Sequence, residues 1–142
     1  MTNNALSTTA LTGTSGDDIL IATQGGETLN GGGGNDVLIG NGGSHVMTGG
    51  SGNDTFAFLH DTDVPATITD FNNTTAHDHI AVSANGFGGG LTAGMDVTQF
   101  FESSNDNQFS GQGPLFHFDT ANDTLYFSAT GTSDSEIVLA LV

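Results

Sequence analysis

The chain has 142 residues and carries 16 acidic side chains, with no lysine, arginine or cysteine. This composition excludes salt bridges to lysine or arginine, disulfide bonds and cysteine-ligated zinc sites, and it leaves nothing that could neutralise the phosphates of a nucleic acid. No apolar run approaches the roughly 20 residues that a transmembrane helix needs, so no transmembrane segment is expected.

The N-terminal segment, residues 1–12, is polar and predicts an arm outside the folded repeats. It lacks the basic region and the apolar core of a secretory signal peptide. If the protein is secreted, it therefore leaves the cell by another route.

Residues 13–57 divide into five consecutive nine-residue units without an insertion. In every unit the fourth residue is glycine, the seventh is β-branched and the eighth is large and apolar. Glycine permits the positive φ of a tight turn, and β-branched residues favour a short strand in the second half of each unit. A single unit cannot bury its apolar eighth residue, so the units must stack on one another.

The pattern resembles the RTX, or repeats-in-toxin, family, whose repeat reads G-G-x-G-x-D-x-U-x with a large apolar residue at U. The resemblance covers about a third of the chain. It implies a parallel β-roll in which two successive units complete one turn. It also implies that calcium is held between turns by backbone carbonyls and by the sixth-position aspartates. The acidic composition agrees, because hard cations prefer oxygen ligands; a merely solubilising acidic surface is the competing interpretation.

In that geometry, units one, three and five share one edge of the roll, the odd edge, and units two and four share the other, the even edge. The sixth residues of the odd edge, Asp18, Asp36 and Asp54, all match the pattern. Those of the even edge, Glu27 and His45, both depart from it. We therefore expect a calcium ladder on the odd edge and a degenerate even edge. The competing hypothesis is that these residues only shape turns, and for the even edge the two hypotheses are equally open.

Two consecutive calcium sites are expected on the odd edge, with Asp36 shared between them. Candidate site 1 lies between units one and three, and its predicted ligands are Asp18, Asp36 and carbonyls near Thr14, Gly16, Gly31 and Gly33. Candidate site 2 lies between units three and five, and its predicted ligands are Asp36, Asp54 and carbonyls near Gly32, Gly34, Gly49 and Ser51.

Residues 58–142 lose the nine-residue period and alternate apolar and polar residues in short runs, which predicts strands. The expected strands cover 66–71, 79–82, 115–118, 124–127 and 136–142, with the third and fourth joined as a hairpin. Residues 85–113 are predicted to be loop, anchored by Phe100 and Phe101. The expected fold is therefore all-β: a parallel β-roll at 13–57, capped by an antiparallel β region at 58–142.

This second region resembles the segment that follows the roll in serralysin-type proteases, at Ile68-Thr69-Asp70-Phe71, at Asp78-His79-Ile80 and at 118–127. The resemblance implies an antiparallel cap and export by a type I secretion system that reads the C-terminal tail. Ala81 stands where the family has the second aspartate of D-x-I-D. Asp70 and Asp78 are candidate additional calcium ligands, with turn-forming roles as the equally open alternative.

No catalytic motif is found in the sequence. The H-E-x-x-H helix of serralysin-type proteases, the G-x-S-x-G nucleophile elbow and the phosphate loop with its lysine are absent. The stretch His77-Asp78-His79 comes nearest to a transition-metal motif, because alternation along a strand puts both histidines on one face. No third ligand is evident, and the sequence predicts a non-catalytic protein.

The favoured function is a secreted, extracellular calcium-binding protein that folds on calcium binding and self-associates as a subunit of a fibre, surface layer or matrix. An open parallel edge of the roll could pair with another copy and give a homo-oligomer or filament, and the initial methionine is compatible with a complete protein. The alternative is a calcium-dependent folding and export module of a larger type I-secreted enzyme or adhesin. Glycan or ice binding has no signal beyond a repetitive surface.

Overall fold

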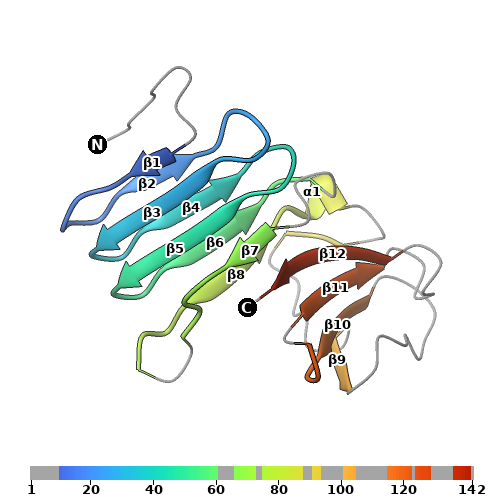
Figure 1. The fold of residues 1–142 in the computed structure, drawn as a ribbon. Coiled ribbons are helices and arrows are strands. Elements are labelled where there is room, and N and C mark those ends of the chain that lie inside the picture. Colours follow the sequence, from blue (N-terminus) through green and yellow to red (C-terminus); the bar gives the residue numbers. More distant parts are fainter. Residues whose placement is uncertain are drawn as a thin grey trace.

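The computed structural model describes residues 10–60, 66–72, 75–87, 91–93, 101–104, 115–122, 124–128 and 136–141. Its N-terminal part is a roll in which the chain passes alternately between two parallel sheets (Figure 1). One sheet begins with β1 (Ala10–Thr12), β3 (Thr28–Gly33), β5 (Val46–Ser51) and β7 (Ala66–Ile68). The other consists of β2 (Ile19–Ile21), β4 (Val37–Gly40), β6 (Thr55–Phe58) and β8 (His79–Val82). The predicted parallel β-roll is confirmed.

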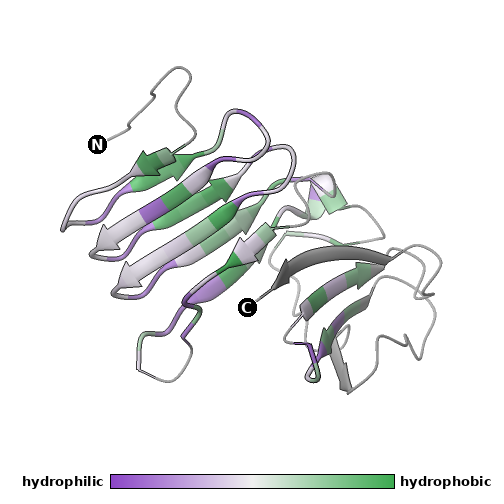
Figure 2. Cartoon of the chain, in the orientation of Figure 1, coloured by the Kyte–Doolittle hydropathy of each residue, from purple (hydrophilic) through white to green (hydrophobic). Residues whose placement is uncertain are grey.

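The apolar eighth residues of the units lie between the two sheets. Leu20, Leu38 and Phe56 are register partners in one sheet, and Leu29 and Met47 are partners in the other. Each of these five side chains is at most 1% exposed. Burying such a side chain contributes about 1.5–3 kcal/mol, so stacking supplies the stability that one unit lacks. In Figure 2 β2, β4 and β6 are largely hydrophobic, whereas β3 and β5 are neutral or hydrophilic over much of their length, as are most of the turns at both edges.

The parallel stack extends beyond residues 13–57 at both ends. β1 lies within the predicted N-terminal arm and pairs with β3. β7 and β8 lie in the region predicted to be antiparallel, yet they pair in parallel with β5 and β6. The assignment of residues 66–82 to an antiparallel cap is therefore wrong. The nine-residue frame does not detect these strands, because the loops before β7 and β8 differ in length from the turns of the repeats. In the strand register, Met47 pairs with Ile68 and Phe56 pairs with Ile80, so the spacing of the repeat is lost.

The C-terminal strands extend the β1–β3–β5–β7 sheet to eight strands. β10 (Leu115–Asp119) and β11 (Thr124–Ser128) form the predicted antiparallel hairpin, and β12 (Glu136–Leu141) is antiparallel to β11. β12 also pairs in parallel with β7, and β9 (Phe101–Ser104) pairs in parallel with β10. The expectation of loop across 85–113 is therefore wrong at β9 and at the short helix α1 (Ala84–Phe87). Phe100 lies outside the described residues.

Aromatic side chains join the roll to the C-terminal strands. Phe87 of α1 contacts Phe127 of β11 edge to face, with ring centroids 5.2 Å apart, and Phe116 of β10 packs on Phe127 at 5.0 Å. All three side chains belong to the same buried cluster as the core of the roll. Within the described ranges no helix is long and apolar enough to cross a membrane.

Candidate calcium sites

The sixth-position aspartates of the odd edge form a ladder across adjacent turns. The backbone N–H of Asp18 donates to Asp36 Oδ1 at 2.8 Å, and that of Asp36 donates to Asp54 Oδ1 at 2.9 Å. The ladder has a further member, because the Asp54 N–H donates to Asp78 Oδ1 at 2.9 Å. All four side chains are buried, at 8% exposure or less. Each carboxylate is thereby fixed inside the edge rather than extended into solvent.

Candidate site 2 brings carboxylate and carbonyl oxygens together between units three and five. Asp36 Oδ2 and the Gly49 carbonyl both border the α-carbon of Gly31, where a methyl group would collide with the carboxylate and lie 2.6 Å from that carbonyl. The carbonyls of Gly32 and Gly34 face the α-carbons of Gly50 and Gly52 in the next turn. The residues that the sequence assigned to this site all lie here: Asp36, Asp54, Gly32, Gly34, Gly49 and Ser51.

Backbone geometry distinguishes the two edges. The second and fourth residues of units three and five all have positive φ, between 100° and 127°: Gly32, Gly34, Gly50 and Gly52. On the even edge, positive φ occurs at the fifth residue of unit two, Gly26, and at the third and fourth of unit four, Gly42 and Gly43. The turns of units three and five thus repeat one conformation that directs carbonyls at the adjacent turn, and the even turns do not share it.

Two carboxylate oxygens of the ladder, Asp36 Oδ2 and Asp54 Oδ2, are buried without a hydrogen-bond partner among the described residues. Burial raises the pKa of Asp36, and repulsion from Asp18 and Asp17 adds to the effect. Burial likewise raises the pKa of Asp54, with repulsion from Asp78, Asp36 and Asp70 adding to it. The chain has no lysine or arginine to offset these charges. The ladder therefore has no lysine or arginine partner.

A calcium ion fits the groups at candidate site 2. Calcium takes about 6–8 oxygen ligands in flexible arrangements, and this space is bordered by carboxylate and carbonyl oxygens from two turns. The unpartnered Asp36 Oδ2 is available to such an ion. The arrangement has only oxygen donors, as a hard cation requires.

Candidate site 1 differs because Asp18 is already engaged within its own turn. Asp18 Oδ2 accepts hydrogen bonds from Thr14 N at 2.6 Å and from Thr14 Oγ1 at 2.8 Å, and these bonds lower the pKa of Asp18. The Thr14 carbonyl accepts the Gly33 N–H at 3.0 Å, and the Gly31 carbonyl faces the adjacent turn at Gly13. The predicted groups of site 1 thus lie together, but a cation would compete with Thr14 for Asp18.

Gly16, the remaining residue predicted for site 1, also lies at this position. Its N–H donates to Thr14 Oγ1 at 3.2 Å, and its carbonyl carbon is 2.6 Å from where a methyl group on Gly34 would stand. Gly16 is not among the residues with positive φ. The turn of unit one therefore departs from the conformation that units three and five share.

A third inter-turn position, candidate site 3, follows between unit five and the residues after β7 that the structure describes, 69–72 and 75–78. Asp54 Oδ2, the second unpartnered oxygen, lies against the α-carbon of Gly49. Asp78 closes the far side: its Oδ1 accepts the Asp54 N–H, and its Oδ2 accepts the Asn72 N–H at 2.9 Å. The structure thus places Asp78 in the ladder. The parallel register of β8 with β6 places Asp78 beside Asp54, although these residues do not follow the nine-residue repeat.

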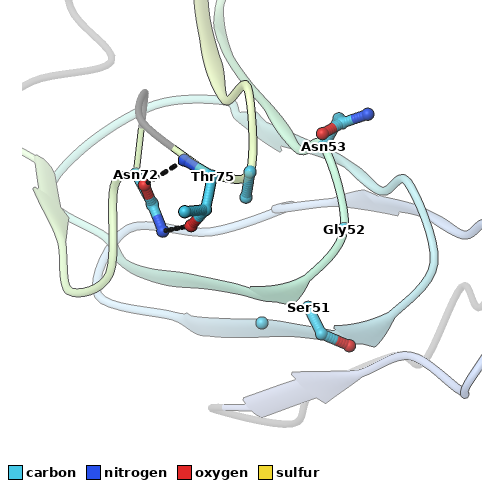
Figure 3. Close-up of a pocket in the computed structure, with 7 residues that line it drawn as sticks. Ser51, Gly52, Asn53, Asn72 and Thr75 are labelled. Atoms are coloured by element: carbon cyan, nitrogen blue, oxygen red, sulfur yellow. Dashed lines mark hydrogen bonds between the residues drawn. The ribbon is translucent and has the colours of Figure 1, made fainter.

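Asp70 lies outside the aspartate ladder. Its two oxygens accept the N–H groups of Gly49 and Gly50 at 2.9 and 2.8 Å, so it closes the start of the turn of unit five. A cavity of about 340 Å³ opens nearby between this turn and the following loop (Figure 3). Asn72 and Thr75, which line it, hold the loop through mutual hydrogen bonds of 2.8 and 3.2 Å.

A second ladder, absent from the sequence prediction, runs through the fifth positions of the odd turns. Asp17 Oδ1 accepts the Asn35 N–H at 2.7 Å, and Asn35 Oδ1 accepts the Asn53 N–H at 2.9 Å. Asn53 Oδ1 then accepts the His77 N–H at 2.9 Å. The recurrence of Asp or Asn at this position in all three odd units was the available signal. These bonds join successive turns beside the aspartate ladder.

His77 contributes its backbone to this second ladder, and the side chains of His77 and His79 are exposed. Among the described residues there is no group of three or more histidine, cysteine, aspartate or glutamate side chains suited to hold a metal. The candidate sites of the odd edge rest instead on carboxylates combined with backbone carbonyls.

Residues 10–25 and 21–56 match the RTX calcium-binding nonapeptide repeat, in 4 copies. No curated protein sequence matches the chain. Among solved structures, the chain is similar to the AlgE6R3 subunit from the Azotobacter vinelandii mannuronan C5-epimerase, with 28% sequence identity and a TM-score of 0.55 over 92% of this chain and 68% of that one. Residues 10–56 are therefore RTX nonapeptide repeats, a calcium-binding motif, folded as a β-roll.

Proposed function

We propose that the chain is a secreted, non-catalytic protein that folds on binding calcium and works outside the cell. The observation that carries the proposal is the pair of buried, unpartnered carboxylate oxygens, Asp36 Oδ2 and Asp54 Oδ2, in a chain without lysine or arginine. Calcium bound between the odd turns would supply the missing positive charge at candidate site 2, and at candidate site 3 with Asp54 and Asp78. Site 1 would bind more weakly because Asp18 is held by Thr14.

Without calcium, two effects oppose folding: repulsion between the acidic side chains and the conformational entropy of the chain. The chain has a net charge of −16, and self-repulsion of this kind opposes the compact state. Its short, glycine-rich units carry a large conformational entropy cost. Low cytosolic calcium would leave the repeats unfolded before export, and the higher calcium outside the cell would fold them. Export by a type I secretion system remains part of the proposal.

Circular dichroism and calorimetry on the intact chain test this dependence of folding on calcium, the calcium gate. In chelator the spectrum should lack the native β signal, and calcium should restore it with heat of binding. Magnesium is the matched control, because it demands smaller octahedral geometry and releases its waters reluctantly. A fully native β spectrum in chelator would refute the proposal.

Self-association into a homo-oligomer, filament or matrix is the further part of the proposed role. β2 stands at the end of its sheet and, among the described strands, pairs only with β4. It presents Ile19 and Ile21 at 49% and 38% exposure, so an apolar, hydrogen-bonding edge supports pairing with a second copy. Electron microscopy with and without calcium tests this role, and monodisperse monomers at millimolar calcium would count against it.

The second candidate function is a folding and export module within a larger secreted enzyme or adhesin. The similarity to a subunit of an epimerase across 92% of this chain supports it. The two candidates share the calcium gate and differ in what the folded roll serves. A long coding region upstream of this chain in the same reading frame would favour the module, and its absence would favour the structural subunit.

A further inference from the structure

The even edge contains two buried polar side chains whose polar atoms lack partners. Glu27 is 3% exposed and His45 is 2% exposed. Among the residues that the structure describes, none is a hydrogen-bond partner of Glu27 Oε1 or of either imidazole nitrogen of His45. Unpaired buried polar atoms are costly, and native structures satisfy most of them. Three such atoms on one edge of the roll point to a missing ligand.

Glu27 and His45 come from adjacent turns. They are the sixth residues of units two and four, and the residues that follow them, Thr28 and Val46, are register partners. The Val46 N–H donates to the Glu27 carbonyl at 3.1 Å. The two side chains therefore start one above the other, as the aspartates do on the odd edge.

Glu27 is hydrogen-bonded within its own turn, and the His45 ring lies close to the first residue of its own unit. Glu27 Oε2 accepts the N–H groups of Thr23 and Gln24 at 2.6 and 3.0 Å, which leaves Oε1 as the unpartnered oxygen. His45 folds in the same direction, since its Cδ2 lies 3.4 Å from the Cβ position of Gly40, the first residue of its unit.

The turns close tightly over these two side chains. A methyl group on Gly43 would stand 2.9 Å from the α-carbon of Gly25, and the Gly26 N–H donates to the Ser44 carbonyl at 2.7 Å. The turns of units two and four are therefore in direct backbone contact beside Glu27 and His45.

We infer that the even edge binds one divalent transition-metal ion of the zinc class, with Glu27 Oε1 and an imidazole nitrogen of His45 as its side-chain ligands. Imidazole suits zinc, copper and nickel, whereas calcium takes oxygen ligands, so this edge would select a different metal from the odd edge. Backbone carbonyls or water complete the coordination, because no third acidic or histidine side chain joins the pair among the described residues. Glu27 and His45, which replace the aspartates of the repeat pattern, would then form a second type of metal site.

The test uses the intact, calcium-saturated chain, so that its outcome is separate from that of the calcium gate. The parent for the titration carries His77→Ala and His79→Ala, which remove two exposed imidazoles that could bind zinc at the surface. Calorimetric titration with Zn²⁺ should show one ion per chain. Glu27→Gln and His45→Gln should each weaken binding at least about tenfold, the lower range for loss of a mere outer-shell partner. His60→Gln, at an exposed histidine, is the matched control and should leave the affinity unchanged.

A readout without substitution at the site covers the case in which a variant fails to fold. In the calcium-saturated parent, Zn²⁺ should shift the ring resonances of His45, and Co²⁺ should give the absorption bands of nitrogen-containing coordination. Unshifted His45 resonances, zinc affinity unchanged in both glutamine variants, or no zinc binding by the parent would each overturn the inference.

Discussion

The odd and even edges of the roll share one nine-residue frame but use their sixth residues differently. On the odd edge, the aspartate is short enough for Oδ1 to accept the N–H of the preceding turn, as Asp36 does from Asp18. On the even edge, Glu27 bends back to the N–H groups of its own turn, and His45 makes no hydrogen bond through its ring. The stacked strands tolerate both arrangements, because the apolar eighth position holds the turns together. The nine-residue frame thus determines the stacking of the strands, and the sixth residue determines which hydrogen bonds each edge makes.

Substitution of the shared aspartate should give the largest difference between the edges. Asp36→Ala removes the acceptor for Asp18 N and the unpartnered oxygen of site 2 together. We expect the calcium midpoint for folding to rise more than about tenfold, with about 1–3 kcal/mol lost from the unsatisfied N–H alone. A calcium titration followed by circular dichroism measures both effects. Glu27→Ala is the matched substitution on the even edge. Equal losses of calcium affinity in the two variants would contradict the proposed difference between the edges.

Two glycine substitutions should separate the effect of steric crowding at candidate site 2 from the effect of backbone strain. A methyl group at Gly31 would collide with the Asp36 carboxylate and crowd the Gly49 carbonyl, so Gly31→Ala should cost about 1–3 kcal/mol from overpacking and also weaken calcium binding. Gly42→Ala on the even edge meets nothing within 4 Å and is strained only by its φ of 85°. We expect it to cost about 1–2 kcal/mol with calcium affinity unchanged. Thermal unfolding and calorimetry check both, and unchanged calcium binding in Gly31→Ala would contradict the placement of site 2.

Acid should partly replace calcium at the odd edge. The folded-state pKa values of Asp36 and Asp54 are raised above the ordinary value of 3.8, so their contribution to stability is full below that value and is lost as pH rises through the folded-state pKa. Asp18 and Asp119 have lowered pKa values, so their contribution is present above 3.8 and is lost as pH falls. In chelator we therefore expect β structure to increase on mild acidification and to decline again in stronger acid.

The asparagine variants of the two ladder residues provide the control for this pH dependence. Asp36→Asn with Asp54→Asn removes the groups with raised pKa values and should abolish the gain on mild acidification. Circular dichroism against pH, in chelator, measures it. A gain of the same size in the double variant would show that the ladder is not its source.

The smallest effect on calcium is expected far from both edges, in the hairpin of β10 and β11. Asp119 accepts the Ala121 N–H at 2.8 Å and the Asn122 side-chain N–H at 2.6 Å, which fixes the turn between these strands. Asp119→Ala should lower the free energy of unfolding by about 1 kcal/mol without changing calcium affinity. Chemical unfolding and calorimetry give the two values. A loss of calcium affinity comparable with that of Asp36→Ala would mean that the hairpin and the ladder are one cooperative unit.

The sequence by itself determined the stacking of the units and the difference between their edges. Both follow from a strict period: Leu20, Leu38 and Phe56 had to share one side, and Asp18, Asp36 and Asp54 had to share one edge. Such regularities are local, so they are readable wherever the frame persists. The recurrence of Asp17, Asn35 and Asn53 was equally readable, and only its meaning was missed.

Tertiary structure alone decided what happens where the frame ends. β7 and β8 join the roll through register with β5 and β6, and that register brings Asp78 into the ladder while Asp70 closes the turn of unit five. It also decided which oxygens are hydrogen-bonded: Thr14 donates to Asp18 Oδ2, whereas no residue that the structure describes donates to Asp36 Oδ2 or Asp54 Oδ2. The physical reason is the same in each case. Strand pairing across loops of unequal length depends on contacts between residues that have no fixed spacing in the sequence. The same is true of competition between donors for a single carboxylate oxygen.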